Sequence, residues 1–331
     1  MMSETPLLSV KDLTVTFAAQ SDLLHPVRGL SFEVERHETL GIIGESGCGK
    51  SVTAEALMGL LPERYCRVGG EACLNGQPLL SPSNDVRRRL RGNALAMIFQ
   101  DPLSSLNPVY TIGFQIEESL RQHTLLSRQA RKARVLELLA QVGMPDPPGC
   151  AAAYPHRLSG GMRQRVMIAI AIACGPALLI ADEPTTALDV TIQAQILALL
   201  EQLKTETDMG IMLITHDLSV VAQMCQRVIV MYLGEIVEQA DVFTLFDDAR
   251  HPYTQALLRA VPNLNASRKG ELPEIAGSVP PLTRTPVGCG FAPRCPLADA
   301  RCHTTPPVLS GTDKPGHLVR CWKADSIGGP S

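Results

Sequence analysis

The stretch from Gly44 to Ser51 reads GESGCGKS and decides the fold class of this chain. It matches the pattern G-x4-G-K-S/T, whose glycines let backbone N–H groups turn inward around phosphate oxygens. An apolar segment, 38–43, runs directly into this loop, and a helix-like segment, 50–61, follows it. The pattern predicts a strand, a phosphate loop and a helix whose positive end points at the phosphates. It places Lys50 on the β- and γ-phosphates and the Ser51 hydroxyl on Mg²⁺.

A second motif, LLIADE at residues 178–183, is an apolar run that ends in two acids. A buried strand places such carboxylates at the crevice where ligands bind in α/β sheets. We therefore expect Asp182 to hold Mg²⁺ and Glu183 to polarise an attacking water as a general base. Acids often end strands by chance, so this pair gains its weight from the phosphate loop beside it.

Further short apolar segments extend the pattern on both sides of the loop. The predicted strands are 7–17, 30–34, 38–43, 94–99, 177–181, 210–215 and 228–231, with a further strand and turn over 71–79. An amphipathic helix is predicted over 115–142, and a helix that is apolar on all sides, hence buried, over 166–174. Short apolar strands that alternate with helices indicate an α/β fold with a largely parallel sheet.

The composition limits the classes of function. The chain has 331 residues, a formal net charge of -3 and 45% hydrophobic residues, which is ample for a buried core. Near-neutral charge disfavours a nucleic-acid partner. Residues 1–13 carry no signal-peptide pattern, and the longest apolar run, 166–181, is interrupted by Gly175 and Pro176. That run falls short of the roughly 20 residues that span a bilayer, so a membrane path would need other subunits.

The segment LSGGMRQ at residues 158–164 precedes the buried helix. Ser159 and two glycines form another helix N-terminus that suits an anion, with simple capping as the alternative. LSGG resembles the signature of the ABC ATPase family, and the rest of that family's pattern follows in order. The resemblance covers roughly 7–239. It implies a P-loop NTPase, RecA-like core, an N-terminal antiparallel β subdomain and a helical signature subdomain at about 103–165.

The resemblance also assigns roles residue by residue. Gln100 resembles the Q-loop glutamine, Asp189 lies in a D-loop-like segment, and His216 resembles the switch histidine that holds the γ-phosphate. Phe17 resembles the aromatic that stacks on adenine, with a core strand aromatic as the alternative. The implied ATP contacts are Phe17, Gly44, Ser46, Gly47, Gly49, Lys50, Ser51, Val52 and Gln100. The implied Mg²⁺ ligands are Ser51, Gln100 and Asp182, and the implied catalytic residues are Glu183, His216 and Lys50.

The family's mechanism explains two anion-binding loops in one chain. Each ATP is held between the Lys50 loop of one ATPase and the Ser159 loop of another. The resemblance therefore implies that Ser159, Gly160, Gly161 and Asp189 serve the nucleotide of a partner ATPase subunit. Every hydrolytic residue of the pattern is present, so we expect a competent site.

Three further stretches narrow the branch of the family. FQDPLSSLNP at 99–108, ADEPTTALDVTIQAQI at 181–196 and HPYTQALL at 251–258 resemble the ATPase subunits of bacterial dipeptide, oligopeptide and nickel importers, the dipeptide branch above all. This resemblance implies a second ATPase chain, two permeases and a periplasmic peptide-binding protein as partners. It implies a peripheral position on the cytoplasmic face of the inner membrane. Importers of nickel, oligopeptides or antimicrobial peptides stay open as alternatives, whereas a single cassette without heptads disfavours a non-transport ABC ATPase.

The last part of the chain differs from the rest in composition. Residues 1–259 are predicted to form the ATPase domain, and 260–331 a proline-rich, irregular extension with four cysteines. These cysteines have the spacing C-x5-C-x6-C-x18-C, which suits Zn²⁺, a 4Fe–4S cluster, or free or disulfide-bonded thiols. The resemblance implies a 4Fe–4S cluster with a structural role. The implied ligands are Cys289, Cys295, Cys302 and Cys321.

One position departs from the common pattern of the loop. Cys48 stands where serine is frequent in related loops. Its neighbour Lys50 and the helix N-terminus predict a lowered thiol pKa, so that alkylation would inhibit the ATPase and ATP would protect it.

Overall fold

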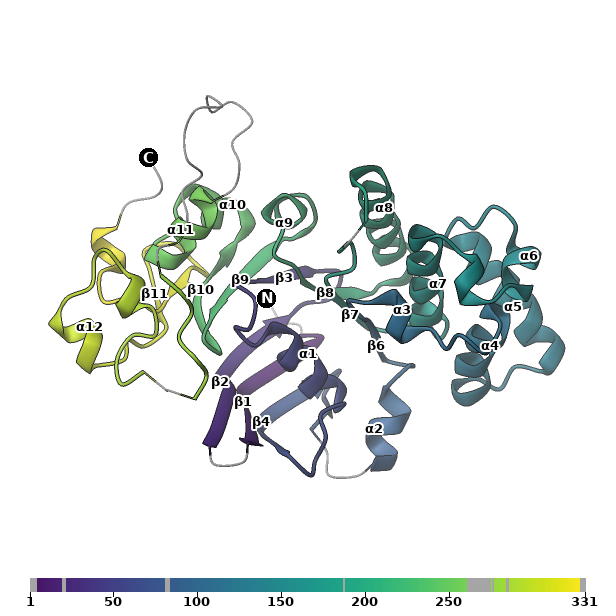
Figure 1. Cartoon of the computed structure of the whole chain (residues 1–331), viewed down its shortest axis with the longest axis horizontal. Coiled ribbons are helices and arrows are strands. Elements are labelled where there is room, and N and C mark those ends of the chain that lie inside the picture. Colours follow the sequence, from purple (N-terminus) through teal and green to yellow (C-terminus); the bar gives the residue numbers. More distant parts are fainter. Residues whose placement is uncertain are drawn as a thin grey trace.

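The computed structural model describes residues 5–19, 22–80, 84–186, 188–260, 275, 277–283 and 286–327. Two sheets organise these residues (Figure 1). The larger sheet has eight strands in the order β11-β12-β10-β9-β3-β8-β7-β6. Its strands are β3 (Thr39–Ile43), β6 (Leu95–Ile98), β7 (Leu178–Asp182), β8 (Gly210–Ile214), β9 (Arg227–Tyr232), β10 (Glu235–Asp241), β11 (Ser310–Gly311) and β12 (Leu318–Val319).

The centre of this sheet is parallel. Strands β9, β3, β8, β7 and β6 pair in parallel, and every residue of β3, β6, β7 and β8 is buried. Burial on both faces explains why the sequence of each strand is a continuous apolar run. The predicted α/β fold with a mostly parallel sheet is confirmed.

The smaller sheet is antiparallel and lies at the N-terminal side of the molecule. Its order is β2-β1-β4-β5, from β1 (Leu8–Ala19), β2 (Asp22–Val34), β4 (Cys66–Leu74) and β5 (Gln77–Pro78). The predicted antiparallel β subdomain is confirmed. The strand and turn predicted over 71–79 are found: β4 ends at Leu74, and Asn75 and Gly76 turn the chain into β5 with φ of 49° and 74°. Two successive positive φ angles are what a tight hairpin turn requires.

Helices of the region between β6 and β7 form one end of the molecule (Figure 1). They are α3 (Pro102–Ser105), α4 (Ile112–His123), α5 (Arg128–Gln141), α6 (Pro147–Ala152), η1 (Pro155–Arg157) and α7 (Gly160–Ile172), with α2 (Asn84–Leu90) before β6. The single helix predicted over 115–142 is wrong. Thr124 ends α4 in an extended conformation, and the Ser127 hydroxyl caps α5 by accepting the N–H of Ala130. The apolar periodicity of the sequence continues across this break, whereas the C-cap of α4 and the N-cap of α5 determine where the two helices end and begin.

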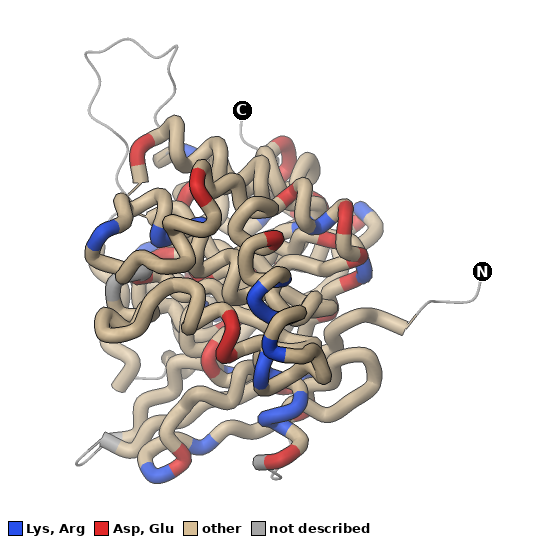
Figure 2. Tube along the Cα trace, turned by 90° about the vertical axis from the view of Figure 1, so that its right-hand side faces the viewer, with Lys and Arg blue, Asp and Glu red and all other residues tan. Residues whose placement is uncertain are grey.

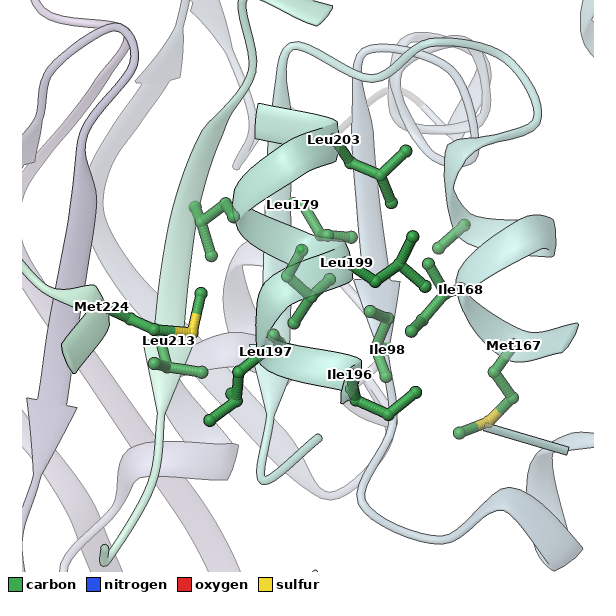
Figure 3. Packing of buried hydrophobic residues seen from close by; sticks show 14 of the residues in the cluster. Ile98, Met167, Ile168, Leu179, Ile196, Leu197, Leu199, Leu203, Leu213 and Met224 are labelled. Carbon is green, nitrogen blue, oxygen red and sulfur yellow. The ribbon is translucent and has the colours of Figure 1, made fainter. Parts of the chain in front are cut away.

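The main core lies between the parallel sheet and the helices that cover it. Figure 3 shows Ile196 and Leu203 of α8 (Val190–Thr207) packed beside Leu179 of β7, and Ile168 of α7. The N-terminal sheet packs with α1 (Lys50–Met58) and the opposite face of the parallel strands in a second cluster. The phosphate loop therefore starts between two apolar clusters.

The C-terminal part continues the main sheet. Its elements are α9 (Leu218–Met224), α10 (Val242–Asp247), α11 (Pro252–Arg259), η2 (Ala292–Arg294), α12 (Ala300–Thr304) and η3 (Ala324–Ser326). Strand β12 pairs antiparallel with β10, Glu238 opposite Val319. Buried His317 holds the same Glu238 through Nε2 at 2.8 Å. The extension is thus joined to the ATPase core through paired backbone, at the end of the molecule opposite α4–α6 (Figure 1).

The boundary predicted at 259/260 stays a prediction. Helix α11 ends at Arg259, and residues 261–274, which include much of the predicted junction, lie outside the described residues. On the face drawn in Figure 2, Lys and Arg positions are intermingled with Asp and Glu positions. Among the described helices, none combines the length and apolar character needed to cross a membrane.

Candidate ATP site

The loop from Gly44 to Ser51 joins β3 to α1, as the sequence predicts. Gly44, Gly47 and Gly49 all have positive φ, at 149°, 81° and 106°. A Cβ on Gly44 would collide with the carbonyl oxygen of Met231, and one on Gly49 with that of Pro26. Two of the three glycines are therefore required by both backbone conformation and close packing.

Lys50 begins α1, and its side chain is buried. Its Nζ lies inside the loop and donates to the carbonyl oxygens of Gly44 and Glu45 at 2.6 and 3.0 Å. The ammonium is therefore surrounded by the backbone of the loop, where the helix N-terminus adds positive potential. Such a loop is built to hold an anion.

Asp182 ends β7 with its side chain buried. Burial raises the pKa of this carboxyl group, Glu183 raises it further, and a hydrogen bond from Ser51 and the charge of Lys50 oppose the rise. Its Oδ1 has no hydrogen-bond partner among the described residues. A buried carboxylate oxygen beside a serine hydroxyl is a donor set that suits Mg²⁺, so these residues fit the predicted ion.

Glu183 is the centre of a hydrogen-bond network. Its carboxylate accepts from Gln100 Nε2 at 2.8 Å and from Thr186 Oγ1 at 2.8 Å, and pairs with His216 Nδ1 at 3.1 Å. Burial raises the pKa of Glu183, but the hydrogen bonds from Thr186 and His216 outweigh it, so the pKa lies below its usual range. Glu183 is thus held ionised as an acceptor.

The backbone of Glu183 is also unusual, with φ at 48°. A non-glycine residue in this region is strained, and such strain concentrates at functional sites. Its N–H bonds to the carbonyl of Ile214 at 2.8 Å, which ties the residue to the end of β8. Thr186, which sequence reasoning missed, lies three residues further on and could have been found as a hydroxyl at the turn that returns toward Glu183.

Strand order explains how these distant residues meet. Gln100, Asp182 and His216 follow or end β6, β7 and β8, and the phosphate loop follows β3. These four strands are neighbours in one parallel sheet, so their carboxyl ends form one edge. His216, whose side chain is 65% exposed, lines a pocket together with Gly44 and Glu45.

The Ser159 loop lies elsewhere. Ser159 caps α7 by accepting the N–H of Met162 at 3.3 Å, and Asp189 caps α8 by accepting that of Ile192 at 2.9 Å. Gly161 lies against Ile192, so the two caps are neighbours. Ser159, Gly160 and Asp189 are exposed, and no described hydrogen bond joins Ser159 to the Lys50 loop. Capping accounts for the Ser159 hydroxyl but not for the exposure of Gly160.

Phe17 lies near the end of β1, opposite Leu24 and Cys66. It is partly exposed and packs against the core of the N-terminal sheet. Both of its sequence interpretations, core aromatic and adenine platform, are compatible with this position.

The lowered pKa predicted for Cys48 is wrong, and its reaction with an alkylating agent stays a prediction. Its side chain is buried, and burial raises the pKa of the thiol, with Lys50 offsetting only part of the rise. Its Sγ lies 3.7 Å from Lys50 Nζ. The charge of Lys50 does not decide the outcome, because burial of the thiol has the larger effect on its pKa.

The four C-terminal cysteines line one small pocket with Phe291 and Trp322. The N–H of Cys289 donates to the carbonyl of Cys302 at 2.8 Å. Burial raises the pKa of Cys289, of Cys295 and, to about 11, of Cys321. Within the described residues, no three His, Cys, Asp or Glu side chains lie close enough together to hold a metal ion.

Known proteins match almost the whole chain. Residues 27–186 match the family model described as ABC transporter, and 237–302 that described as oligopeptide/dipeptide transporter, C-terminal region. The dipeptide transport ATP-binding protein DppD of Escherichia coli is 50% identical over 326 residues, covering 98% of this chain and 99% of that protein. The chain belongs to the ABC transporter family. As an ABC ATPase, it binds and hydrolyses ATP.

Two other known proteins are similar to different shares of the chain. A probable peptide ABC transporter ATP-binding protein of Sinorhizobium fredii is 52% identical, covering 97% of this chain and 96% of that protein. The dimeric ATP-binding cassette MJ0796, solved in a post-hydrolysis state with ADP and Pi, has a TM-score of 0.64 and 26% identity. It covers 71% of this chain and 98% of its own length. The peptide-transporter relative thus spans nearly the whole of this ABC ATPase, and the cassette a smaller share.

Proposed function

We propose that this ABC ATPase powers the import of dipeptides across the bacterial inner membrane. The observation that carries the proposal is the Glu183 network beside the Lys50 loop, in a chain related to dipeptide and peptide transport ATP-binding proteins over nearly its full length. The chain works at the cytoplasmic face, bound to two permeases and a second ATPase. A periplasmic binding protein delivers the peptide, which never contacts this chain.

The triphosphate occupies the Lys50 loop. Glycine backbone N–H groups, the Lys50 ammonium and the N-terminal turn of α1, with Ser51 and Val52, hold the β- and γ-phosphates. Ser51, Asp182 and Gln100 would hold Mg²⁺, which would neutralise charge on the transferred phosphoryl group. The unpaired Oδ1 of Asp182 supports this role.

Hydrolysis follows from the acceptor character of Glu183. The oxygen of a water forms a bond to the γ-phosphorus, the bond to the β–γ bridging oxygen breaks, and ADP leaves. One proton of that water passes to the Glu183 carboxylate. Gln100 and His216 orient the carboxylate, and His216 reaches the γ-phosphate from the exposed side. The residue is ionised before the reaction because its pKa is low.

Ser159, Gly160, Gly161 and Asp189 serve the nucleotide held by the partner ATPase. The exposure of Ser159, Gly160 and Asp189 at the starts of α7 and α8 supports this assignment. Each chain therefore supplies half of each of two sites. Binding of ATP between them closes the dimer, and hydrolysis reopens it.

The permeases dock on the segment after Gln100. Val109, Tyr110 and Phe114 expose 69%, 45% and 41% of their surfaces there, and the Tyr110 and Phe114 rings stack at 4.6 Å. Adjacent exposed aromatics on one surface are typical of protein interfaces. This surface follows Gln100 directly, so nucleotide state and docking surface are connected through a short stretch of chain.

The C-terminal cysteines fit a 4Fe–4S cluster. Four thiols surround one pocket that Phe291 and Trp322 help to enclose. Four cysteine thiolates are the ligand set that such a cluster takes. The cluster would clamp the extension. Iron and sulfide analysis of anaerobically purified chain tests this, and stoichiometric zinc without iron would overturn it.

The function is tested in proteoliposomes that contain the chain, the second ATPase, both permeases and the binding protein. ATP-driven uptake is measured for a labelled dipeptide, a longer peptide and Ni²⁺. We expect dipeptide uptake that depends on ATP and disappears with Glu183→Gln. Uptake of Ni²⁺ or of the longer peptide alone would overturn the substrate while leaving the ATPase intact. ATP hydrolysis without uptake of any of the three would overturn the importer assignment.

A further inference from the structure

The phosphate loop is tied to the C-terminal extension by a partly buried ion pair. Arg294 donates from Nη1 to Oε2 of Glu45 at 2.7 Å and from Nη2 to Oε1 at 3.1 Å. Glu45 is the second residue of the loop, whereas Arg294 ends η2 and directly precedes Cys295. The two residues are 249 positions apart in the chain. The pair therefore connects two sites that the sequence keeps separate.

Arg294 is held rigidly in this position. Its side chain is only 4% exposed, and it also donates to the hydroxyl of Tyr232 at 3.3 Å and to the carbonyl of Ile275 at 3.2 Å. Its guanidinium carbon lies 5.9 Å from the ring centroids of both Tyr232 and Phe291. A bidentate pair with so many supporting contacts fixes direction as well as distance.

Glu45 is held a second time through its backbone. Its N–H donates to the hydroxyl of Tyr253 at 2.8 Å, and Tyr253 is fully buried in α11. The Tyr253 ring packs against Phe291 with centroids 5.4 Å apart. The side chain of Glu45 is thus held by Arg294 and its N–H by Tyr253, both in the C-terminal part of the chain. Its carbonyl oxygen accepts a hydrogen bond from Lys50.

The charge of Glu45 makes this arrangement functional. A free carboxylate in a phosphate loop repels the triphosphate, because like charges separated by a few ångströms in a partly buried site repel strongly. We propose that Arg294 is a positioning residue for ATP: it neutralises Glu45 and fixes the first half of the loop. The extension thereby sets the affinity of the ATPase for nucleotide. This inference rests on the assignment of the Lys50 loop to the phosphates of ATP.

The test uses the full chain for ATP binding and the assembled transporter for kinetics. Arg294→Met removes the charge but keeps the side-chain length, so we expect the Kd and the KM for ATP to rise roughly tenfold. We expect kcat to change less than about twofold, since the lost interaction is the same in the ground and transition states. Arg294→Lys should recover part of the affinity. Arg301→Met is the matched control, because Arg301 is exposed in the same extension over the Trp322 ring.

The double variant Glu45→Gln with Arg294→Met separates this role from support of the extension. Without the carboxylate there is no repulsion to neutralise, so the double variant should bind ATP nearly as tightly as the unmodified chain. Unchanged Kd in Arg294→Met would overturn the inference, as would a double variant as weak as the single one. Lys50→Ala tests the underlying assignment separately: if it binds ATP normally, the phosphate loop itself is misassigned.

Discussion

In the proposed mechanism, Glu183 is the residue on which hydrolysis depends. Three hydrogen bonds fix its carboxylate, from Gln100, Thr186 and His216, and its strained backbone aims it at the edge of the sheet. Removing the charge while keeping the shape should separate binding from hydrolysis. We expect Glu183→Gln to bind ATP with unchanged Kd and to lose at least about 100-fold in turnover, the usual contribution of a general base.

The control for this prediction is Glu206→Gln, an exposed carboxylate near the end of α8. It should leave both the Kd and the turnover unchanged. Turnover of Glu183→Gln within a few fold of the unmodified chain would show that another group accepts the proton.

The positions of single residues were predictable where a local sequence motif determines the backbone. The glycines of the phosphate loop and the acids that end β7 occupy the places that their motifs predict, because strand order brings the motifs together. Cys48 was not predictable, since the direction of its side chain depends on packing against the core. Thr186 and Arg294 acquire their roles from contacts that no local pattern records.

Helix α11 provides a prediction at the scale of an element. His251 caps this helix, because its Nδ1 accepts the N–H of Tyr253 at 3.1 Å. Burial lowers the pKa of His251 to about 4, the charge of Glu238 opposes the shift, and that of Arg320 adds to it. The folded state therefore keeps His251 neutral over a range of pH where the unfolded chain binds a proton.

The sign of the pH effect follows from this difference. The stabilisation is fully present above the ordinary histidine pKa of about 6.5 and is lost as the pH falls through the folded value. We expect the free energy of unfolding to fall by about 2 kcal/mol from this group between about pH 6.5 and about pH 5. Denaturant titrations at the two values measure it. His251→Asn, whose side-chain oxygen can still cap the helix, should show a shallower slope, and an equal slope would contradict the account.

Elements were predictable in type more than in extent. The buried strands were found because burial on both faces leaves a continuous apolar run. The helix predicted over 115–142 concealed a break at Thr124, whereas the turn predicted within 71–79 is found at Asn75 and Gly76, directly after β4. In both places the helix caps or turn residues, not the apolar pattern, determine where the element ends.

At the scale of the molecule, the extension is the part that sequence described least well. The proline-rich composition of residues 260–331 predicted an irregular extension. The spacing of its four cysteines predicted that they share one site. The sequence contains no sign that β12 would pair with β10, or that His317 would reach buried Glu238. Those contacts join segments about 80 residues apart, and only tertiary packing determines them.

In the proposed function, exposed Ser159 and buried Lys50 belong to two different sites, and the chain supplies one half of each. An isolated chain has Glu183 and the phosphate loop at its own nucleotide, but this nucleotide lacks the Ser159 loop of a partner ATPase. We therefore expect a dilute, purified chain to bind ATP and hydrolyse it slowly, and the assembled transporter to hydrolyse it much faster per chain.

The most direct test is the rate of ATP turnover per chain, measured for the isolated chain over a dilution series and for the assembled transporter. The composite-site account predicts a rate that falls on dilution of the isolated chain and rises at least about tenfold on assembly, with Ser159→Arg suppressing the rise. A rate per chain that is independent of dilution and equal in the assembled transporter would contradict it.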